Sequence, residues 1–145
     1  MKKDLTILPV SYSEDSFRQR AHNLIGKKGE LGNEVFHRFG KETPNCVFEV
    51  KLVAFKDDIA ISQMIRDQTQ IGWIPGNVWH LLLSPGAVTI RSGDTAAFPS
   101  TTNTDPKEFP TLYEWGYTRR LKVLDLSELL GRTRLKLLFV RPYVR

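Results

Sequence analysis

Apolar side chains near the start of the chain recur every three to four residues, at Phe17, Ala21, Leu24 and Ile25. This spacing places them on one face of a helix. Ser13 comes before two acidic residues, which suits a helix start because a serine oxygen accepts a free backbone N–H and the helix dipole favours negative charge there. The pattern predicts a helix over residues 14–25.

The remaining hydrophobic pattern predicts one more helix, one helical turn and a series of short strands. Leu31, Val35 and Phe39 fall one turn apart, so residues 30–39 form the second predicted helix. Residues 78–83 form a helical turn. Runs rich in β-branched and aromatic residues predict strands over residues 46–55, 59–65, 69–74, 87–91, 117–126 and 133–143.

The segment at residues 92–111 lacks any hydrophobic period and is rich in Ser, Thr, Pro and Asp. Such composition predicts a long surface loop. It would precede a basic C-terminal β-hairpin. A chain of 145 residues suits one domain, so we treat residues 1–145 as a single unit. The predicted fold is α+β, with a small, mostly antiparallel sheet or partly closed β-barrel and one or two N-terminal helices.

Positive charge gathers in the last fifth of the chain. The net charge is +5, and residues 119–145 hold eight Lys or Arg against two acidic residues. In the two predicted C-terminal strands, alternation places Arg120 and Lys122 on one face and Arg132, Arg134 and Lys136 on one face, so a hairpin would present them as one stripe. The residues predicted to bind an acidic partner are these five and the adjacent Arg119. A cationic stripe of this kind favours an acidic partner, either nucleic acid (DNA or RNA) or an acidic protein.

Two tryptophans flank the turn in "QIGWIPGNVWHLL", residues 70–82. Pro75 ends a strand because it cannot donate to the ladder, and the following Gly76 and Asn77 suit a turn. We expect Trp73 to fill the core and Trp79 to be exposed, where it could stack on a base.

The same stretch resembles two families of small barrels over residues 57–83. "GWIPGNV" is similar to the Gly-Trp-Ile-Pro-Ser-Asn-Tyr-Val ending of SH3 domains and to the Gly-Tyr-Ile-Pro strand and short helix of HIRAN domains. In the second comparison, residues 59–61 match the preceding strand. The Asn-x-x-Asp motif of HIRAN domains and the acidic loop of SH3 domains are absent. The HIRAN resemblance implies a barrel that binds single-stranded DNA ends.

A separate hypothesis concerns Glu49 and Lys51, which alternation places on one face of the strand over residues 46–55. This Glu-x-Lys pair resembles the PD-(D/E)xK nucleases, in which the carboxylate holds a divalent metal and the lysine steadies the attacking water. The acid of the preceding strand is missing. A solvent-facing Glu/Lys alternation is the simpler interpretation.

The sequence thus favours a nucleic-acid-binding domain that uses a basic strand face and aromatic stacking. The alternatives are a protein-interaction module, such as an inhibitor, an antitoxin-like or an immunity-like protein, and a small nuclease. No nucleotide-binding or hydrolase motif and no metal-ligand spacing is present, so we expect no cofactor and no metal. The single cysteine and the lack of a long apolar run predict a cytoplasmic protein without a membrane anchor.

Overall fold

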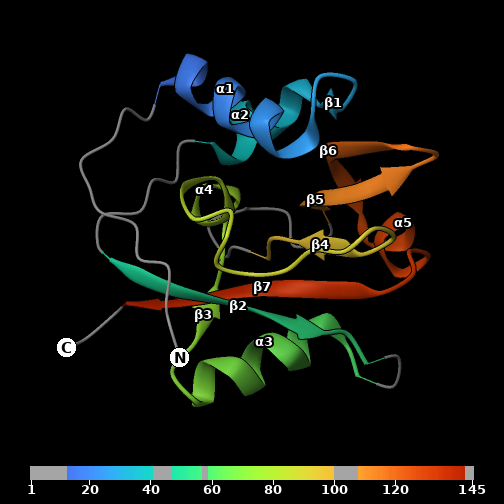
Figure 1. Ribbon diagram of the computed structural model, residues 1–145. Coiled ribbons are helices and arrows are strands. Elements are labelled where there is room, and N and C mark those ends of the chain that lie inside the picture. Colours follow the sequence, from blue (N-terminus) through green and yellow to red (C-terminus); the bar gives the residue numbers. More distant parts are fainter. Residues whose placement is uncertain (1–12, 41–46, 57–58, 100–107, 143–145) are drawn as a thin grey trace.

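The computed structural model describes residues 13–40, 47–56, 59–99 and 108–142, and they form an α+β fold around one seven-stranded sheet (Figure 1). The helices are α1 (Glu14–Ile25), α2 (Asn33–Phe39), α3 (Ile61–Gln70), α4 (Val78–Leu83) and α5 (Leu126–Leu130). The strands are β1 (Glu30–Leu31), β2 (Phe48–Ala54), β3 (Ile74–Pro75), β4 (Thr95–Ala97), β5 (Glu108–Trp115), β6 (Thr118–Asp125) and β7 (Leu135–Pro142).

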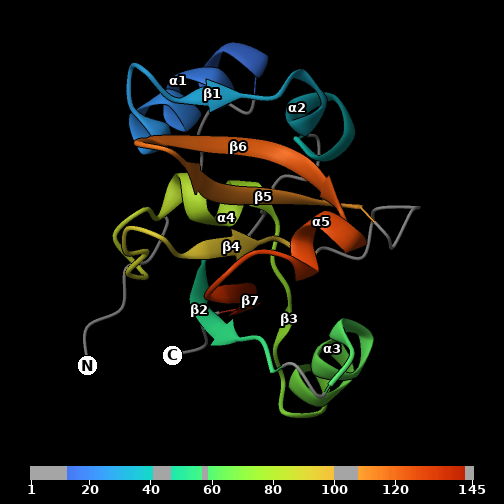
Figure 2. The ribbon, with the colours of Figure 1, turned by 90° about the vertical axis from the view of Figure 1, so that its right-hand side faces the viewer.

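The predicted fold class is confirmed, and the sheet stays open rather than closing into a barrel. Its strand order is β1-β6-β5-β4-β7-β2, with β3 pairing to β7 off this path. Four of the six pairings are antiparallel, whereas β1–β6 and β4–β7 are parallel. Figures 1 and 2 show α1 and α2 at one end of the strand stack and α3 at the other.

Both faces of the sheet are covered, and each has its own hydrophobic core. Alternate residues of β7 divide between them, because Leu138 belongs to one core while Leu137 and Phe139 belong to the other. The first core is closed mainly by α1, α2 and α4. The second is closed by α3, α5 and Trp73. A sheet covered on both faces has few positions for a long solvent-facing stripe of charge.

The first predicted helix is confirmed over Glu14–Ile25, with the Ser13 side chain accepting the backbone N–H of Ser16 at 3.1 Å. The helix predicted over residues 30–39 is shorter, because its first two residues pair with β6 as β1. The backbone N–H of Gly32 also donates to the carbonyl of Leu121 at 2.8 Å. The helix therefore begins only at Asn33.

The strand predicted over residues 59–65 is wrong, as is most of the one over residues 69–74. Residues 61–70 form α3, which buries Ile61 and Met64 on one face. The β-branched residues suggested a strand, but the three-residue spacing of these two buried side chains fits a helix. Of residues 69–75, only Ile74 and Pro75 form a strand, β3.

The part of the chain predicted as a strand at 87–91 and a loop at 92–111 is arranged differently. Residues 87–91 form no strand, whereas Thr95–Ala97 form β4, buried in the middle of the sheet. β5 begins at Glu108, inside the predicted loop. Some predicted positions lie outside the described residues. They are residues 100–107 of that loop, the first residue of the strand predicted over 46–55 and the last residue of the strand predicted over 133–143. The strands predicted at 46–55, 117–126 and 133–143 are confirmed as β2, β6 and β7.

The predicted hairpin between the two basic strands is wrong. β5 and β4 lie between β6 and β7, so at about 4.8 Å per strand the two are about 14 Å apart. They also run parallel, since β5 is antiparallel to β6 and to β4, and β4 is parallel to β7. Parallel strands need a crossover connection. The crossover contains α5, whose start is fixed by a capping box between Asp125 and Glu128.

Candidate nucleic-acid interface

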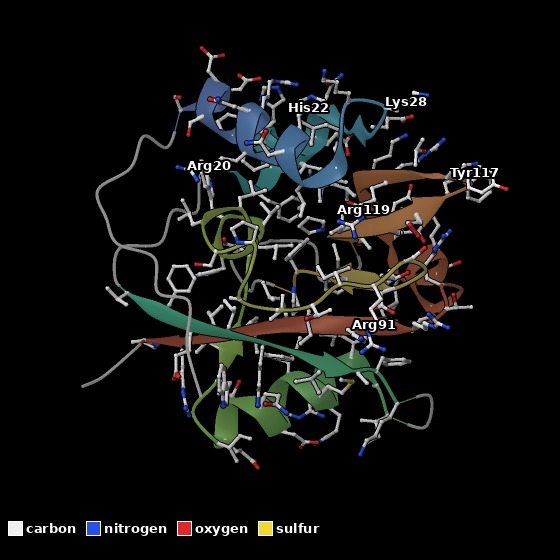
Figure 3. All side chains as sticks on the ribbon, viewed as in Figure 1. Arg20, His22, Lys28, Arg91, Tyr117 and Arg119 are labelled. Carbon is white, nitrogen blue, oxygen red and sulfur yellow. The ribbon has the colours of Figure 1, made fainter. Side chains whose placement is uncertain are left out.

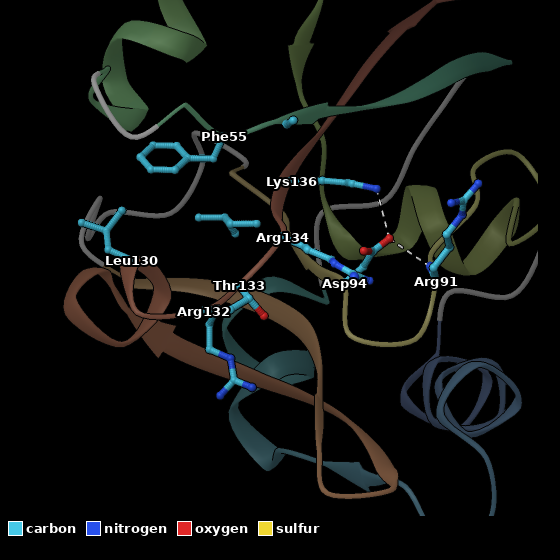
Figure 4. A pocket seen from close by; sticks show the side chains of 10 residues that line it. Phe55, Arg91, Asp94, Leu130, Arg132, Thr133, Arg134 and Lys136 are labelled. Carbon is cyan, nitrogen blue, oxygen red and sulfur yellow. Dashed lines mark hydrogen bonds and ion pairs between the residues drawn. The ribbon is translucent and has the colours of Figure 1, made fainter.

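A cavity of about 710 Å³ opens where β2 ends and β7 begins (Figure 4). We call it the basic cleft, because four cationic side chains and one carboxylate line it beside the apolar Phe55, Leu130 and Leu135. The charged residues are Arg91, Asp94, Arg132, Arg134 and Lys136. Three of the six cations predicted to bind nucleic acid are therefore brought together here, although not by a hairpin.

Asp94 is the buried anchor of the basic cleft, with 4% of its surface exposed. Its Oδ2 accepts the Lys136 ammonium at 3.0 Å and the backbone N–H of Arg91 at 3.0 Å, drawn as dashed lines in Figure 4. Burial opposes the charged form, but these two hydrogen bonds and the lysine charge outweigh it and hold the pKa of Asp94 below its usual value. Lys136 is thus used internally, as the counter-ion of Asp94.

The three arginines of the basic cleft have no carboxylate within ion-pairing distance among the described residues. The Nη2 of Arg132 donates to the backbone carbonyl of Glu114 at 2.9 Å, and the Nη1 of Arg134 donates to the carbonyl of Ser92 at 3.3 Å. A carbonyl orients a guanidinium but does not neutralise it, and each guanidinium carries five N–H donors. These arginines therefore keep both their charge and free donors for a ligand.

Arg134 also has an unusual backbone, because it is the only non-glycine residue with positive φ (52°) in the described part of the chain. This left-handed conformation costs an ordinary residue about 1–2 kcal/mol. It places Arg134 one residue before β7, in the turn that leads into the strand. Strain at a charged, exposed position that a glycine could occupy more easily favours a role for the side chain.

Glu114, near the end of β5, is hydrogen-bonded to the turn at Ser92 and Gly93. Its carboxylate accepts the Ser92 hydroxyl at 2.8 Å and the backbone N–H of Gly93 at 2.7 Å. These hydrogen bonds hold the pKa of Glu114 below its usual value. Gly93 adopts φ +87° in the same turn, which a glycine does without strain. The turn that carries Arg91 and Asp94 is therefore tied to β5.

The other three predicted cations lie on β6, away from the cleft lining, and each has an internal partner. Arg119 donates to the backbone carbonyls of Leu24 at 3.3 Å and Ile90 at 3.1 Å. Arg120 and Lys122 both pair with Glu30, whose single negative charge offsets one of their two positive charges. They hold β6 to the α1–β1 region rather than forming one stripe with the cleft residues.

Trp79 is not the exposed stacking residue that the sequence suggested. Its exposed fraction is 0%, its Nε1 donates to the carbonyl of Gly40 at 2.5 Å, and its ring packs edge-on against Phe17 with centroids 5.4 Å apart. Trp73 is buried as expected, at 8% exposed. Both tryptophans of residues 70–82 are therefore core residues.

Glu49 does not face solvent as expected but is buried, with 8% of its side chain exposed. Its Oε2 accepts the Nε of Arg141 at 2.6 Å, across the β2–β7 pair. Lys51 and Arg141 also lie 4.3 and 4.4 Å from the Trp73 ring centroid. Burial and the Arg141 charge lower the pKa of Lys51. The Glu49 carboxylate, which would bind the metal in a nuclease, is therefore paired with Arg141 instead.

Within the described residues, no group of three or more His, Cys, Asp and Glu side chains is placed to hold a metal ion. None of the described helices is long and apolar enough to cross a membrane.

Sequence reasoning missed three residues at this surface, namely Arg91, Asp94 and Trp115. Arg91 and Asp94 flank a Ser-Gly dipeptide, which is a turn signal in the sequence. Trp115 precedes Gly116 between two strand-like runs, which is a hairpin signal. No local signal shows that the turn before β4 lies beside the start of β7.

No known family, curated protein or solved structure matches this chain, so its resemblance to HIRAN and SH3 domains over residues 57–83 stays a prediction.

Proposed function

We propose that the protein binds nucleic acid by holding backbone phosphates in the basic cleft. The observation that carries this proposal is the set of three arginines, Arg91, Arg132 and Arg134, around one cavity without an ion-pair partner among the described residues. Guanidinium groups bind phosphate oxygens through two parallel N–H donors. Arg132 and Arg134 each use one Nη donor on a backbone carbonyl, so their remaining N–H groups, with those of Arg91, are the donors that phosphate oxygens would meet.

The cleft is also held in shape before a ligand arrives. The Asp94–Lys136 pair joins the turn before β4 to β7, and the Glu114 hydrogen bonds join the same turn to β5. Preformed donors lose less conformational entropy on binding than mobile surface cations do. This arrangement favours a ligand with several closely spaced negative charges over free monovalent anions.

The alternatives from the sequence remain open to the same experiment. A protein-interaction module would use the exposed apolar residues, and an acidic protein would compete with nucleic acid for the cleft. The nuclease hypothesis finds less support, because Glu49 is buried against Arg141. Phosphate binding is therefore the function that the cleft supports best.

The test is a binding titration with a fluorescein-labelled 12-nucleotide strand at several salt concentrations. A triple variant, Arg91→Ser, Arg132→Ser and Arg134→Ser, should lose most of the affinity. Each lost phosphate contact lowers the slope of log K against log salt by about 0.7 for single strands, so the three together should lower it by about 2.

A matched variant separates cleft contacts from net charge. Arg18, Arg20 and Arg66 lie on α1 and α3 and do not line the cleft, and Figure 3 shows Arg20 and Arg91 on opposite sides of the view. Replacing these three with Ser removes the same charge and should leave most of the affinity. Equal losses in the two triple variants, or an unchanged affinity in the cleft variant at low salt, would contradict the proposal.

A further inference from the structure

The tip of the β5–β6 hairpin presents two aromatic side chains to solvent. Trp115 is 59% exposed and Tyr117 is fully exposed, whereas the other two tryptophans are buried. Figure 3 shows Tyr117 pointing outward from the hairpin. Large aromatic rings at a tip are costly to leave in water, so a cluster of this kind favours a binding role.

The tip is a rigid turn rather than a loose loop. Trp115 pairs with Thr118 across the hairpin, which leaves Gly116 and Tyr117 as a two-residue connection. Positive φ at Gly116 (65°) and its absence at Tyr117 fit a type II′ turn. The Thr118 hydroxyl donates to the carbonyl of Trp115 at 3.2 Å. The backbone that carries both rings is therefore ordered before a ligand stacks on them.

The tip is also joined to the basic cleft through Arg132. The guanidinium of this cleft residue lies 4.6 Å from the Tyr113 ring centroid and 6.0 Å from that of Trp115, and Arg120 lies 5.8 Å from Trp115. The adjacent Glu114 ties the same strand end to the cleft turn at Gly93. The Arg132 guanidinium of the cleft therefore lies close to the exposed Trp115 ring.

We infer that Trp115 and Tyr117 are a base-stacking platform that makes the basic cleft selective for single-stranded nucleic acid. This inference rests on the proposed function, because it assumes that phosphates occupy the cleft. Inside a duplex the base faces are covered by their neighbours, so a protruding ring stacks there only at the cost of unstacking the bases, whereas the face of an unpaired base is accessible. Stacking is tolerant of sequence, since every base has an aromatic face. The partner is then an unpaired strand of DNA or RNA with little sequence preference.

The test compares three 12-unit probes: oligo(dT), an abasic strand with the same phosphates, and a duplex. Stacking of one base on an aromatic side chain changes affinity by about 5- to 150-fold. The wild-type protein should therefore bind oligo(dT) more tightly than the abasic strand by a factor in this range. It should also bind oligo(dT) more tightly than the duplex. In the double variant Trp115→Ala, Tyr117→Ala the preference for bases should disappear, while binding of the abasic strand remains.

Two controls keep the readout specific. Trp115→Phe and Tyr117→Phe together should retain most of the preference, because phenylalanine also stacks. Tryptophan fluorescence of the wild type should be quenched by oligo(dT), and Trp115→Phe should remove that quenching because Trp73 and Trp79 are buried.

The outcomes separate this inference from the proposed function. Equal affinity of the wild type for oligo(dT) and the abasic strand, with binding still lost in the cleft triple variant, would overturn the platform alone. A base preference that persists in the double alanine variant would overturn it as well. Failure of the wild type to bind any of the three probes would overturn the proposed function together with the platform.

Discussion

His80 should make the protein lose stability between pH 7 and pH 5. It lies in α4, where its Nδ1 accepts the backbone N–H of Asn77 at 3.0 Å and its ring packs edge-on against Phe48 with centroids 4.7 Å apart. A proton on Nδ1 would break that hydrogen bond. Burial lowers the pKa of His80 from its ordinary 6.5 to about 4.

The sign of the effect follows from which state takes up the proton first. As pH falls below 6.5 the unfolded chain protonates this histidine while the folded protein keeps it neutral, so the free energy of unfolding decreases. The decrease stops below about pH 4, where both states are protonated. With these two pKa values the linkage relation gives a loss of about 2 kcal/mol between pH 7 and pH 5. That is a large share of the roughly 5–15 kcal/mol that stabilises a domain of this size.

The assay is urea unfolding at pH 7, 6 and 5 for the wild type and His80→Gln. Glutamine can accept the same backbone N–H, as it does at this position of other capping boxes, but it does not titrate. The wild type should lose about 2 kcal/mol more than the variant over this range. All other titrating groups are common to both proteins and cancel in the difference. Parallel loss of stability in the two proteins would refute the assignment of a buried neutral histidine.

Three further substitutions test the core and the cleft. Trp79→Ala should destabilise the fold by about 3–5 kcal/mol, because it empties a fully buried site and leaves the carbonyl of Gly40 without its indole donor; thermal denaturation measures this. Lys136→Met should cost about 1–3 kcal/mol in urea unfolding at pH 7, because Asp94 is left buried without its counter-ion. Arg134→Gly should change stability by less than about 1 kcal/mol, because relief of the left-handed backbone offsets the added chain entropy. Its affinity for oligo(dT) should nevertheless fall, and an unchanged affinity would argue against a role for this side chain.

Local patterns predicted the elements whose signals agree with their surroundings. The α1 helix has a cap, acidic residues in its first turn and a regular apolar face, and all of these indicate the same structure. α3 was missed because Ile59, Ile61 and Ile65 have strand propensity, while its helical spacing rests on few residues. Tertiary packing under β7 decides in favour of the helix, since that spacing buries Ile61 and Met64 together.

The candidate site was predicted only in part, because its members meet through long-range pairing. Arg132, Arg134 and Lys136 were identified by charge, but Arg91 and Asp94 join them only because β4 pairs in parallel with the start of β7. Trp79 was misplaced for a related reason: nothing local shows that α1 and Gly40 would cover it. The sequence reports charge and period, whereas the fold decides which charges are neutralised.

β7 pairs with three other strands, and this has a consequence for how the chain is made. Among the described residues, β2 and β3 have no strand partner other than β7, and the β2–β7 pair joins residues more than 80 positions apart. Every other described element leaves the ribosome before residues 135–142 do. Until then β2 exposes unpaired backbone groups, which is the condition in which nascent chains recruit chaperones or aggregate. The complete sheet can therefore assemble only after synthesis has passed residue 142, and a chain that stops before residue 135 should not reach the native fold.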